Sequence, residues 1–323
     1  GLLSSPVKKK ISQWFLLRTL LTFYRSKEMK VGFIGLGIMG RPMAKNLLKK
    51  GYELVVNTHN DETMAEFKAL NAETASCAKE VAEKCDVIIT MLPNSPQVTE
   101  VALGKGGIIE GAHEGLVLID MSSIDPVETK KIAAALNEKG IEMIDAPVSG
   151  GEPKAIDGTL SVMVGGNKAT FDKFYELMMA MAGSVVYVGE IGSGNIAKLA
   201  NQIIVACNIA AMSEALSFAT KAGADPKRVF DAIKGGLAGS TVLNAKAPMV
   251  LERNFKPGFR IELHIKDLTN ALNAAHAISA PVPLTGEVME MMQTLKVMGC
   301  QKEDHSALAK YYELLSGVTI ESK

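Results

Sequence analysis

The sequence predicts an α/β fold in which a doubly wound, mostly parallel sheet is followed by an all-α helical domain, joined to it by a long interdomain helix. From Lys30 to about Gly189, short apolar runs alternate with helical stretches, which is typical of parallel strands covered on both faces. After Gly192 the strand-like runs stop and helical periodicity takes over. A chain of 323 residues is also long enough for two domains.

The first 28 residues differ in character from the rest of the chain. They contain six lysine and arginine residues and one acid, so they carry +5, which leaves −5 for the remainder of a chain of net charge zero. We interpret residues 1–28 as an extension outside the fold, 29–191 as the sheet domain and 192–323 as the helical domain. A transit peptide is the alternative for the extension, because it too would be basic and poor in acids. A secretory signal is disfavoured, since Arg18 interrupts the apolar run.

The elements of the sheet domain follow from apolar runs and their punctuation. Helices are expected where amphipathic stretches end at Gly51 or begin at Pro126, because glycine ends helices and proline suits their first turn. The predicted strands cover 30–35, 53–57, 86–92, 115–122, 140–148, 159–166 and 183–190. The predicted helices cover 41–50, 61–70, 78–84 and 126–139.

The helical domain is predicted to start with a long helix over 195–222. Its uncharged core, Leu199–Ser213, contains three amides and is shorter than the ~20 apolar residues that span a bilayer, so we expect a buried helix. Further helices are predicted over 226–236, 266–278, 283–298 and 306–315.

Composition excludes several classes of function. A net charge of zero gives no support to a nucleic-acid partner. The four cysteines form no C-x-x-C pair and the five histidines are scattered, so we expect neither a disulfide framework nor a metal site. Cysteines without a framework fit a reducing compartment, and we expect a cytoplasmic protein.

A glycine motif follows the first predicted strand and opens a helix. Gly35 permits a tight turn, Gly37 lets a pyrophosphate approach the backbone, and Gly40 lets helix and strand pack closely. The helix start would offer N–H groups to the phosphates. The motif therefore predicts a Rossmann-type dinucleotide-binding domain, with further cofactor contacts from Leu36, Ile38 and Met39.

The end of the second strand should select the cofactor. Asn57 and Thr58 stand where an acid would bind the NAD ribose or an arginine the NADP phosphate. The cofactor is therefore NAD or NADP. We lean slightly to NADP, because the nearest carboxylate, Asp61, lies further on.

Two more strand ends belong at the same edge of the sheet, where ligands bind in such folds. Met91, Leu92 and Pro93 can pack on the cofactor, although Pro93 could equally be a plain strand stop. Ser123 can hydrogen-bond near the nicotinamide or the substrate.

The segment Ser149-Gly150-Gly151 follows a later strand. Its hydroxyl and two unshielded N–H groups could form a small anion-binding concavity that suits a substrate carboxylate. An ordinary Gly-Gly turn is the alternative explanation.

Lys198 stands near the start of the long helix, where a cation is unfavourable for the helix dipole. Asn201 and Gln202 share its helix face. Its amine could donate a proton to a reacting carbonyl if burial and nearby positive charge lowered its pKa. A lysine with its head in solvent is the alternative. Lys266 is expected at another helix start, where it again hints at an anionic partner, whereas its neighbour Asp267 suits that position.

Four stretches together resemble the β-hydroxyacid dehydrogenases from Met29 to about Val318: GFIGLGIMGRPMAKNLL, DAPVSGG, GSGNIAKLAN and FRIELHIKDL. The resemblance implies a Rossmann domain followed by an all-helical domain. It also implies reduction of small aldehyde acids, or oxidation of the matching hydroxy acids, with NAD or NADP. The longer stretches SGGEPKAIDGTLSVMVGG, GGLAGSTVLNAKAPMV and RNFKPGFRIELHIKDL narrow the implied reaction to tartronate semialdehyde giving D-glycerate.

The resemblance also implies roles for single residues. Lys198 matches the catalytic lysine, and Ser149, Gly150 and Gly151 match the loop that binds the substrate carboxylate. The remaining matches are Lys266 near the cofactor, Asp267 in the active-site cleft, Ser123 beside the nicotinamide and Phe259 over the substrate.

The sequence departs from the family at two places. Gln202 stands where many relatives have asparagine, and we expect Asn201, or else Gln202, to hold the substrate hydroxyl. Asn57-Thr58 replaces the usual Asp or Asn-Arg, which leaves the cofactor preference open.

Other functions stay open. The same residues would serve 3-hydroxyisobutyrate, glyoxylate or succinic semialdehyde as substrate. A catalytically silent dinucleotide-binding module is the alternative of another class. We expect a small aldehyde-acid or hydroxy-acid partner, no nucleic acid, no membrane, and a homo-oligomer, a dimer or tetramer.

Overall fold

The computed structural model describes residues 29–322 and divides them into two compact units. Unit 1 contains the residues up to Ser122 and Thr129–Gly192, and unit 2 contains Ser123–Glu128 and the residues from Ser193 onward. The extension 1–28, with both of its interpretations, lies outside the described residues.

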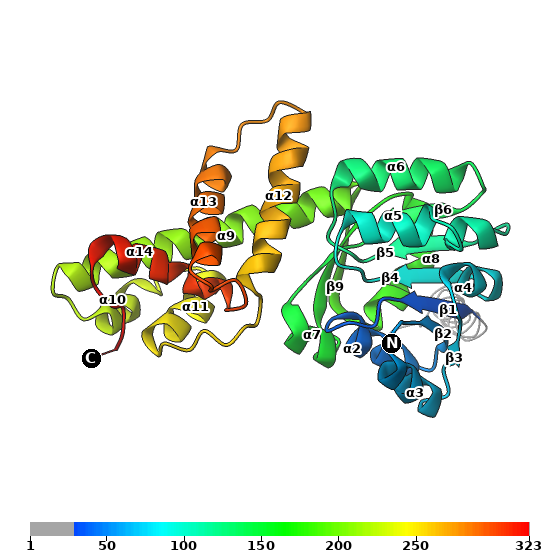
Figure 1. The fold of residues 1–323 in the computed structure, drawn as a ribbon, viewed down its shortest axis with the longest axis horizontal. Helices are drawn as coiled ribbons and strands as arrows, with labels where there is room; N and C mark the ends of the chain where they lie inside the picture. The colour runs from blue at the N-terminus through cyan, green and yellow to red at the C-terminus, as the bar shows by residue number, and fades with distance from the viewer. Residues whose placement is uncertain (1–28, 323) are drawn as a thin grey trace, which may run out of the picture. The chain divides into compact units, whose positions relative to one another are not determined.

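Unit 1 is built on one mixed sheet, and Figure 1 labels its strands except β7 and β8. The strands are β1 (Lys30–Ile34), β2 (Glu53–Asn57), β3 (Glu73–Thr74), β4 (Val87–Thr90), β5 (Val117–Asp120), β6 (Glu142–Asp145), β7 (Val148–Ser149), β8 (Leu160–Gly165) and β9 (Ala182–Gly189).

The order of the strands is β3-β2-β1-β4-β5-β6-β8-β7, with β9 paired to β8. The strands from β3 to β6 pair in parallel, whereas β8 runs antiparallel to β6 and β7. The chain proceeds outward from β1 to β3, then returns to β4 and proceeds outward in the other direction. The predicted mostly parallel, doubly wound sheet is confirmed, and the order reverses between β1 and β4.

Helices cover this sheet. They are α2 (Gly40–Lys49), α3 (Asp61–Ala69), α4 (Ala78–Lys84), α5 (Ser95–Leu103), α6 (Pro126–Asn137), α7 (Gly151–Asp157) and α8 (Lys168–Met179), with a 3₁₀ turn η1 (Ile108–Gly111). No helix was predicted for α5, α7 or α8. In α8 the buried residues Phe171, Phe174 and Leu177 recur at the spacing of one helix face. They pack into the core of unit 1 with the strands.

Unit 2 is helical. It contains α9 (Ser193–Lys221), α10 (Pro226–Ile233), α11 (Thr241–Leu251), α12 (Ile261–Ala277), α13 (Pro283–Val297), a 3₁₀ turn η2 (His305–Leu308) and α14 (Ala309–Ser316). The predicted long helix is α9, and α10 to α14 all contact it (Figure 1).

α9 is apolar because other helices surround it. By length and hydropathy it could cross a membrane, but the core helix of a soluble protein passes the same test. Its residues Ile209, Met212 and Leu216 are buried in one cluster with residues of α10 to α14. We therefore interpret α9 as the core helix of unit 2, as the sequence analysis expected.

Two helix predictions in this unit were wrong, and one helix was not predicted. α12 begins at Ile261 rather than Lys266. Ile261 is buried, and the backbone N–H groups of the first turn donate to the carbonyls of Glu303 and Gln301, which fixes this turn in place. α11 was missed, although Ser240 caps it by accepting the Leu243 N–H. The last predicted helix, 306–315, is the turn η2 followed by α14.

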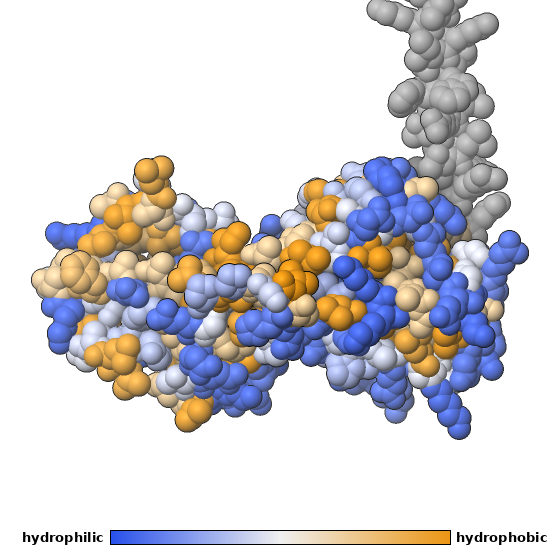
Figure 2. Space-filling view, turned by 90° about the horizontal axis from the view of Figure 1, so that it is seen from above, coloured by the Kyte–Doolittle hydropathy of each residue, from blue (hydrophilic) through white to orange (hydrophobic). Residues whose placement is uncertain are grey.

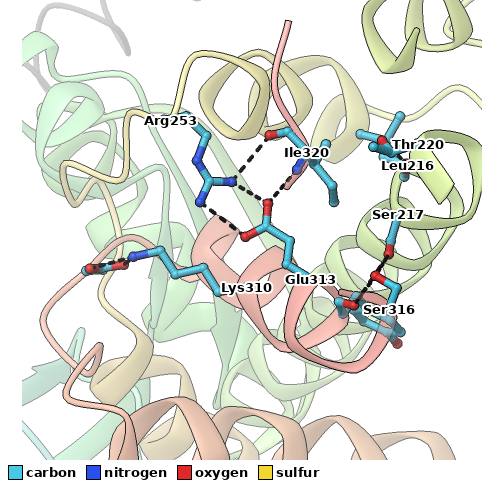
Figure 3. A network of polar contacts seen from close by, with 10 residues as sticks. Leu216, Ser217, Thr220, Arg253, Lys310, Glu313, Ser316 and Ile320 are labelled. Carbon is cyan, nitrogen blue, oxygen red and sulfur yellow. Dashed lines mark hydrogen bonds and ion pairs between the residues drawn. The ribbon is translucent and has the colours of Figure 1, made fainter. Parts of the chain in front are cut away.

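Polar contacts fix the C-terminal segment to unit 2 (Figure 3). Arg253 forms a two-point ion pair with Glu313, and the same carboxylate accepts the Ile320 N–H at 2.7 Å. Ser217 on α9 and Ser316 on α14 share a hydrogen bond of 2.7 Å. These contacts hold α14 against α9, so the segment after α14 has a defined position.

Candidate active site

The glycine motif lies where the strand order of unit 1 reverses. Gly35 follows β1, and its φ of +99° belongs to the left-handed region. A Cβ at Gly35 would overlap the Met91 carbonyl, and a Cβ at Gly40 would overlap the Gly35 carbonyl, so the protein itself requires both glycines. A Cβ at Gly37 would meet no protein atom within 4 Å. The fold itself therefore does not require glycine at position 37, where the motif predicts that a pyrophosphate would approach the backbone.

The other residues of this loop differ in exposure. Leu36 is buried in the core, Met39 packs against it, and Ile38 is exposed. α2 starts at Gly40 with no side-chain cap. The Arg41 N–H donates to the Gly37 carbonyl at 2.9 Å and Pro42 has no N–H, so an anion would be bound by the N–H groups that precede Arg41. The loop therefore fits a dinucleotide phosphate group.

The segment after β4 lies beside this loop. The Met91 N–H donates to the Ile34 carbonyl at 3.0 Å, and the Leu92 N–H donates to the Ser122 hydroxyl at 2.9 Å. Pro93 is exposed. The structure thus brings together Met91 to Pro93 and the glycine loop within unit 1.

The end of β2 is held by its own polar residues. Asn57 is buried and donates to the Ala75 carbonyl at 2.9 Å. Asn60 caps α3 by accepting the Thr63 N–H, and the Thr58 hydroxyl accepts the Asn60 N–H at 3.3 Å. No carboxylate stands between β2 and Asp61, as the sequence already showed.

The proposed carboxylate loop also belongs to unit 1. Ser149 ends β7, Gly150 has a φ of +140°, and Gly151 begins α7 with a φ of +68°. These backbone angles explain both glycines without a ligand, so the geometry of the loop is compatible with an anion site and with a plain turn.

Buried polar residues that the sequence analysis missed fix neighbouring strand ends. The Asp120 carboxylate accepts the Thr90 hydroxyl at 2.8 Å and the Ser122 N–H at 3.1 Å. The Asp145 carboxylate accepts the Gly192 N–H at 2.7 Å. Thr90, Asp120 and Asp145 pair in register on β4, β5 and β6. This row at the carboxyl edge could have been found by aligning the strand ends.

A second group of predicted residues gathers inside unit 2. Lys198 on α9 is only 5% exposed, and its ammonium donates to Gln202 Oε1 at 3.3 Å. Asn201 donates to the same oxygen at 2.9 Å. Gln202 Nε2 donates to Asp267 Oδ2 on α12 at 2.6 Å. The solvent-exposed alternative for Lys198 is therefore wrong, because the side chain lies inside the unit.

Lys266 completes this group. Its ammonium donates to the Ser123 carbonyl at 2.8 Å and lies 2.9 Å from Asp267 Oδ1. α12 begins at Ile261, so Lys266 and Asp267 lie in its second turn, and the dipole argument used for them was wrong. Their contacts explain their positions instead.

The environment lowers the pKa of Lys198. Burial is the largest cause, the nearby Lys266 acts in the same direction, and Asp267 opposes both. The sequence analysis expected these two causes, burial and nearby positive charge. A lysine with a lowered pKa can release its proton more readily than an exposed one.

Phe259 lies against a third group of buried residues. Its ring contacts the rings of His264 and His305, with centroids 5.6 and 5.4 Å away. Its N–H and that of Gly258 donate to Asp304 Oδ2 at 3.1 and 3.0 Å. Sequence reasoning missed this group, whose members stand far apart in the chain.

Asp304 is fully buried and pairs with Lys246 at 2.9 Å. Burial alone would raise the pKa of Asp304, but the ion pair with Lys246 and the hydrogen bond from the Ser306 N–H oppose burial, and that pKa is lowered to about 2. Asp304 is therefore an ionised anchor for the segment that carries Phe259. In the part of the chain that the structure describes, no group of three or more His, Cys, Asp or Glu side chains could hold a metal ion.

Comparison with known protein families gives a match within each unit. The NAD-binding domain of 6-phosphogluconate dehydrogenase matches residues 30–189, and the NAD-binding domain of NADP-dependent 3-hydroxyisobutyrate dehydrogenase matches residues 192–312.

Full-length relatives are also similar. The 2-hydroxy-3-oxopropionate reductase of Escherichia coli (strain K12) is 46% identical over 89% of this chain and 98% of its own. The mitochondrial 3-hydroxyisobutyrate dehydrogenase of Mus musculus is 37% identical over 88% of each chain. The structure of Mycobacterium tuberculosis 3-hydroxyisobutyrate dehydrogenase with L-serine has a TM-score of 0.82 at 29% identity, covering 87% of this chain and 98% of its own.

Proposed function

Because the chain belongs to the 3-hydroxyisobutyrate dehydrogenase-like family of β-hydroxyacid dehydrogenases, as its motifs predicted, we propose that it reduces tartronate semialdehyde to D-glycerate. The family makes it an NAD(P)-dependent oxidoreductase that acts on hydroxyacids. The choice of substrate is supported by the 46% identity to the Escherichia coli 2-hydroxy-3-oxopropionate reductase. The observation that carries the chemistry is the buried Lys198 with its lowered pKa.

The glycine loop of unit 1 is proposed to hold the cofactor. A bound NADH or NADPH would supply the hydride. The loop residues Gly35–Gly40, which lead into α2, would bind the pyrophosphate, because the N-terminal end of a helix favours an anion. Further cofactor contacts are proposed for Asn57, Thr58, Met91, Leu92, Pro93, Ser123 and Lys266. A slight preference for NADP is supported by the lack of a carboxylate between Asn57 and Asp61.

Lys198 is proposed as the proton donor. Its ammonium would protonate the alkoxide that forms from the aldehyde and would stabilise its charge. Since the donor must be protonated, the rate of reduction should fall as the pH rises through the lowered pKa of Lys198. Oxidation of the hydroxy acid needs the neutral amine, so its rate should fall as the pH drops through the same value.

Different residues are proposed to contact the carboxylate and the hydroxyl of the substrate. Ser149, Gly150 and Gly151 are proposed to bind the carboxylate, with Ser123, Phe259 and Asp267 as further substrate contacts. Both the oxygen and the nitrogen of the Gln202 amide form hydrogen bonds with protein groups. In the contacts described, Asn201 forms one hydrogen bond, in which its Nδ2 donates to Gln202 Oε1. This supports Asn201 as the contact to the substrate hydroxyl and Gln202 as the residue that holds Lys198.

The proposal is tested by steady-state assays with NADH and NADPH in parallel. Tartronate semialdehyde should give the highest kcat/KM among four substrates, the others being methylmalonate semialdehyde, succinic semialdehyde and glyoxylate. A higher value for another aldehyde acid would replace the proposed substrate, and no cofactor oxidation with any of them would favour a silent binding module.

Lys198→Ala tests the proton donor. The variant should bind the dinucleotide as tightly as the wild type but lose turnover by ~100-fold or more. Lys221→Ala, at the exposed end of the same helix, is the control and should keep full turnover. Near-normal turnover in Lys198→Ala would overturn the assignment.

Self-association is proposed for unit 2. Figure 2 shows hydrophobic residues interspersed with hydrophilic ones over the helical unit, and Phe218 is 74% exposed although it belongs to α9. Exposed apolar side chains of this kind support a dimer or tetramer. Sedimentation of the full chain tests it, and a monomer at micromolar concentration would contradict it.

A cytoplasmic location stays our proposal. The four cysteines of the described residues are free, which fits a reducing compartment. The printed names of some relatives, such as the Mus musculus enzyme, include "mitochondrial", so a transit peptide remains the alternative reading of residues 1–28. Fractionation of cells that express the full chain would decide between them.

A further inference from the structure

A pair of buried histidines lies directly behind the Lys198 group. His264 on α12 and His305 on η2 are 0% and 5% exposed, and their Nδ1 atoms lie 2.9 Å apart. His264 Nε2 lies 3.1 Å from the backbone carbonyl oxygen of Gln202 on α9. The pair therefore connects η2 to α9 through α12.

The contacts determine where the protons of the pair lie. A carbonyl oxygen only accepts, so His264 Nε2 must carry a proton and donate it to Gln202. A neutral His264 then has a bare Nδ1 that accepts, and the proton between the two rings must belong to His305 Nδ1. One arrangement of protons thus satisfies both hydrogen bonds, with two neutral rings.

The charges around the pair favour that neutral state. Burial lowers the pKa of both histidines, and the cations Lys198 and Lys246 act in the same direction. The acids oppose this shift, Asp267 at His264 and Asp304 at His305. The charged groups that face the pair therefore come from every element packed against it: Lys198 on α9, Lys246 on α11, Asp267 on α12 and Asp304 before η2.

His264 and Asp267 bind the same residue at two points. They stand one turn apart on one face of α12, where His264 donates to the Gln202 backbone and Asp267 accepts from the Gln202 side chain. The carboxylate fixes the orientation of the amide, because a flipped amide would place its oxygen against Asp267. Gln202 Oε1 is thereby directed at the Lys198 ammonium.

We propose that the neutral His264–His305 pair positions Gln202 and, through it, the ammonium of Lys198. This inference rests on the proposed role of Lys198 as proton donor. His264 and His305 are positioning residues in this scheme. His264 fixes the place of Gln202 along α9, and His305 fixes the proton arrangement that lets His264 donate.

Two substitutions of His264 separate positioning from packing. A glutamine amide nitrogen can take the place of His Nε2 and keep the donor to the Gln202 carbonyl, whereas an asparagine amide reaches only the place of Nδ1. His264→Gln should keep kcat within about threefold of the wild type. His264→Asn should lower kcat by about tenfold, the usual scale for losing one hydrogen bond to an aligned group.

The difference between the pH profiles of the two variants gives a readout that a packing defect common to both would not produce. In His264→Asn, loss of the hydrogen bond to the Gln202 carbonyl should loosen the site around Lys198. The midpoint, which is the pH at which the rate of reduction is half-maximal, should therefore rise toward the ordinary pKa of lysine. In His264→Gln it should stay at the wild-type pH. Equal kcat values and equal midpoints in the two variants would overturn the proposal, whatever their melting temperatures.

His305 supplies a second comparison if both His264 variants fail to fold. His305→Asn keeps a donor near the place of Nδ1, and His305→Leu removes it. The same difference in kcat and midpoint is expected, and equality would overturn the inference. The proposed function itself fails by a different result, namely full turnover in Lys198→Ala.

Discussion

The two units build their candidate sites in different ways. In unit 1 the glycine loop is made by backbone, within the few residues from Gly35 to Gly40, and glycines shape it. In unit 2 the group around Lys198 is made by side chains of α9 and α12, together with the backbone carbonyl of Ser123. The stability of a loop made by backbone depends on whether neighbouring atoms leave space for a side chain. The stability of a buried group of charged side chains depends on the free-energy cost of removing those charges from water.

This difference predicts how each unit fails. A glycine loop should tolerate an added methyl group only where no protein atom stands in its way. The side-chain cluster should lose most when a charge is left without its partner. The substitutions below test this comparison in order of decreasing expected effect on the free energy of unfolding.

Asp304→Ala should be the most destabilising change. It removes the partner of Lys246 and the acceptor of the Gly258 and Phe259 N–H groups, so the free energy of unfolding should fall by about 3–5 kcal/mol. Urea unfolding measures it. Asp172→Ala, which removes an exposed pair with Lys168, is the control and should change little. A small effect of Asp304→Ala would show that the buried charge is not an anchor.

Gly40→Ala should lower the stability of the protein, whereas Gly37→Ala should lower its affinity for the dinucleotide. An alanine methyl group at position 40 would overlap the Gly35 carbonyl, so the free energy of unfolding should fall by about 1–3 kcal/mol. At position 37 the methyl group meets no protein atom, so stability should stay near the wild type. The dinucleotide Kd of Gly37→Ala should nevertheless rise by about tenfold. Unchanged dinucleotide affinity in Gly37→Ala, measured by fluorescence titration, would remove the argument that position 37 faces the pyrophosphate.

Lys198→Met should stabilise unit 2 while abolishing turnover. Burial of the amine disfavours its charged form, so replacing it should raise the free energy of unfolding by about 0.5–2 kcal/mol. The effect has a defined pH dependence. Between the lowered pKa and the ordinary 10.5, the unfolded chain binds a proton that the folded chain lacks, so wild-type stability rises with pH there.

The gain in Lys198→Met should therefore be larger at neutral pH than near pH 10. Thermal melts at both pH values, with Lys221→Ala as the control, measure it. A variant that is less stable than the wild type at neutral pH would mean that the hydrogen bond to Gln202 outweighs the cost of burial.

The sequence by itself determined the fold class and the glycine loop, and it identified Lys198 as a candidate site residue. Each depends on residues close together in the chain: alternating runs, the spacing of Gly35, Gly37 and Gly40, and a cation near the start of an apolar helix. Local geometry decides such features, so spacing is enough to read them.

The tertiary structure decided the partners. Nothing in the sequence joins His264 to His305, Lys246 to Asp304 or Gln202 to Asp267, because each pair is far apart in the chain and packing sets its distance. The start of α12 was misplaced for the same reason, since backbone bonds to Gln301 and Glu303 fix its first turn. A buried polar group must find a partner, and which partner it finds depends on the whole fold.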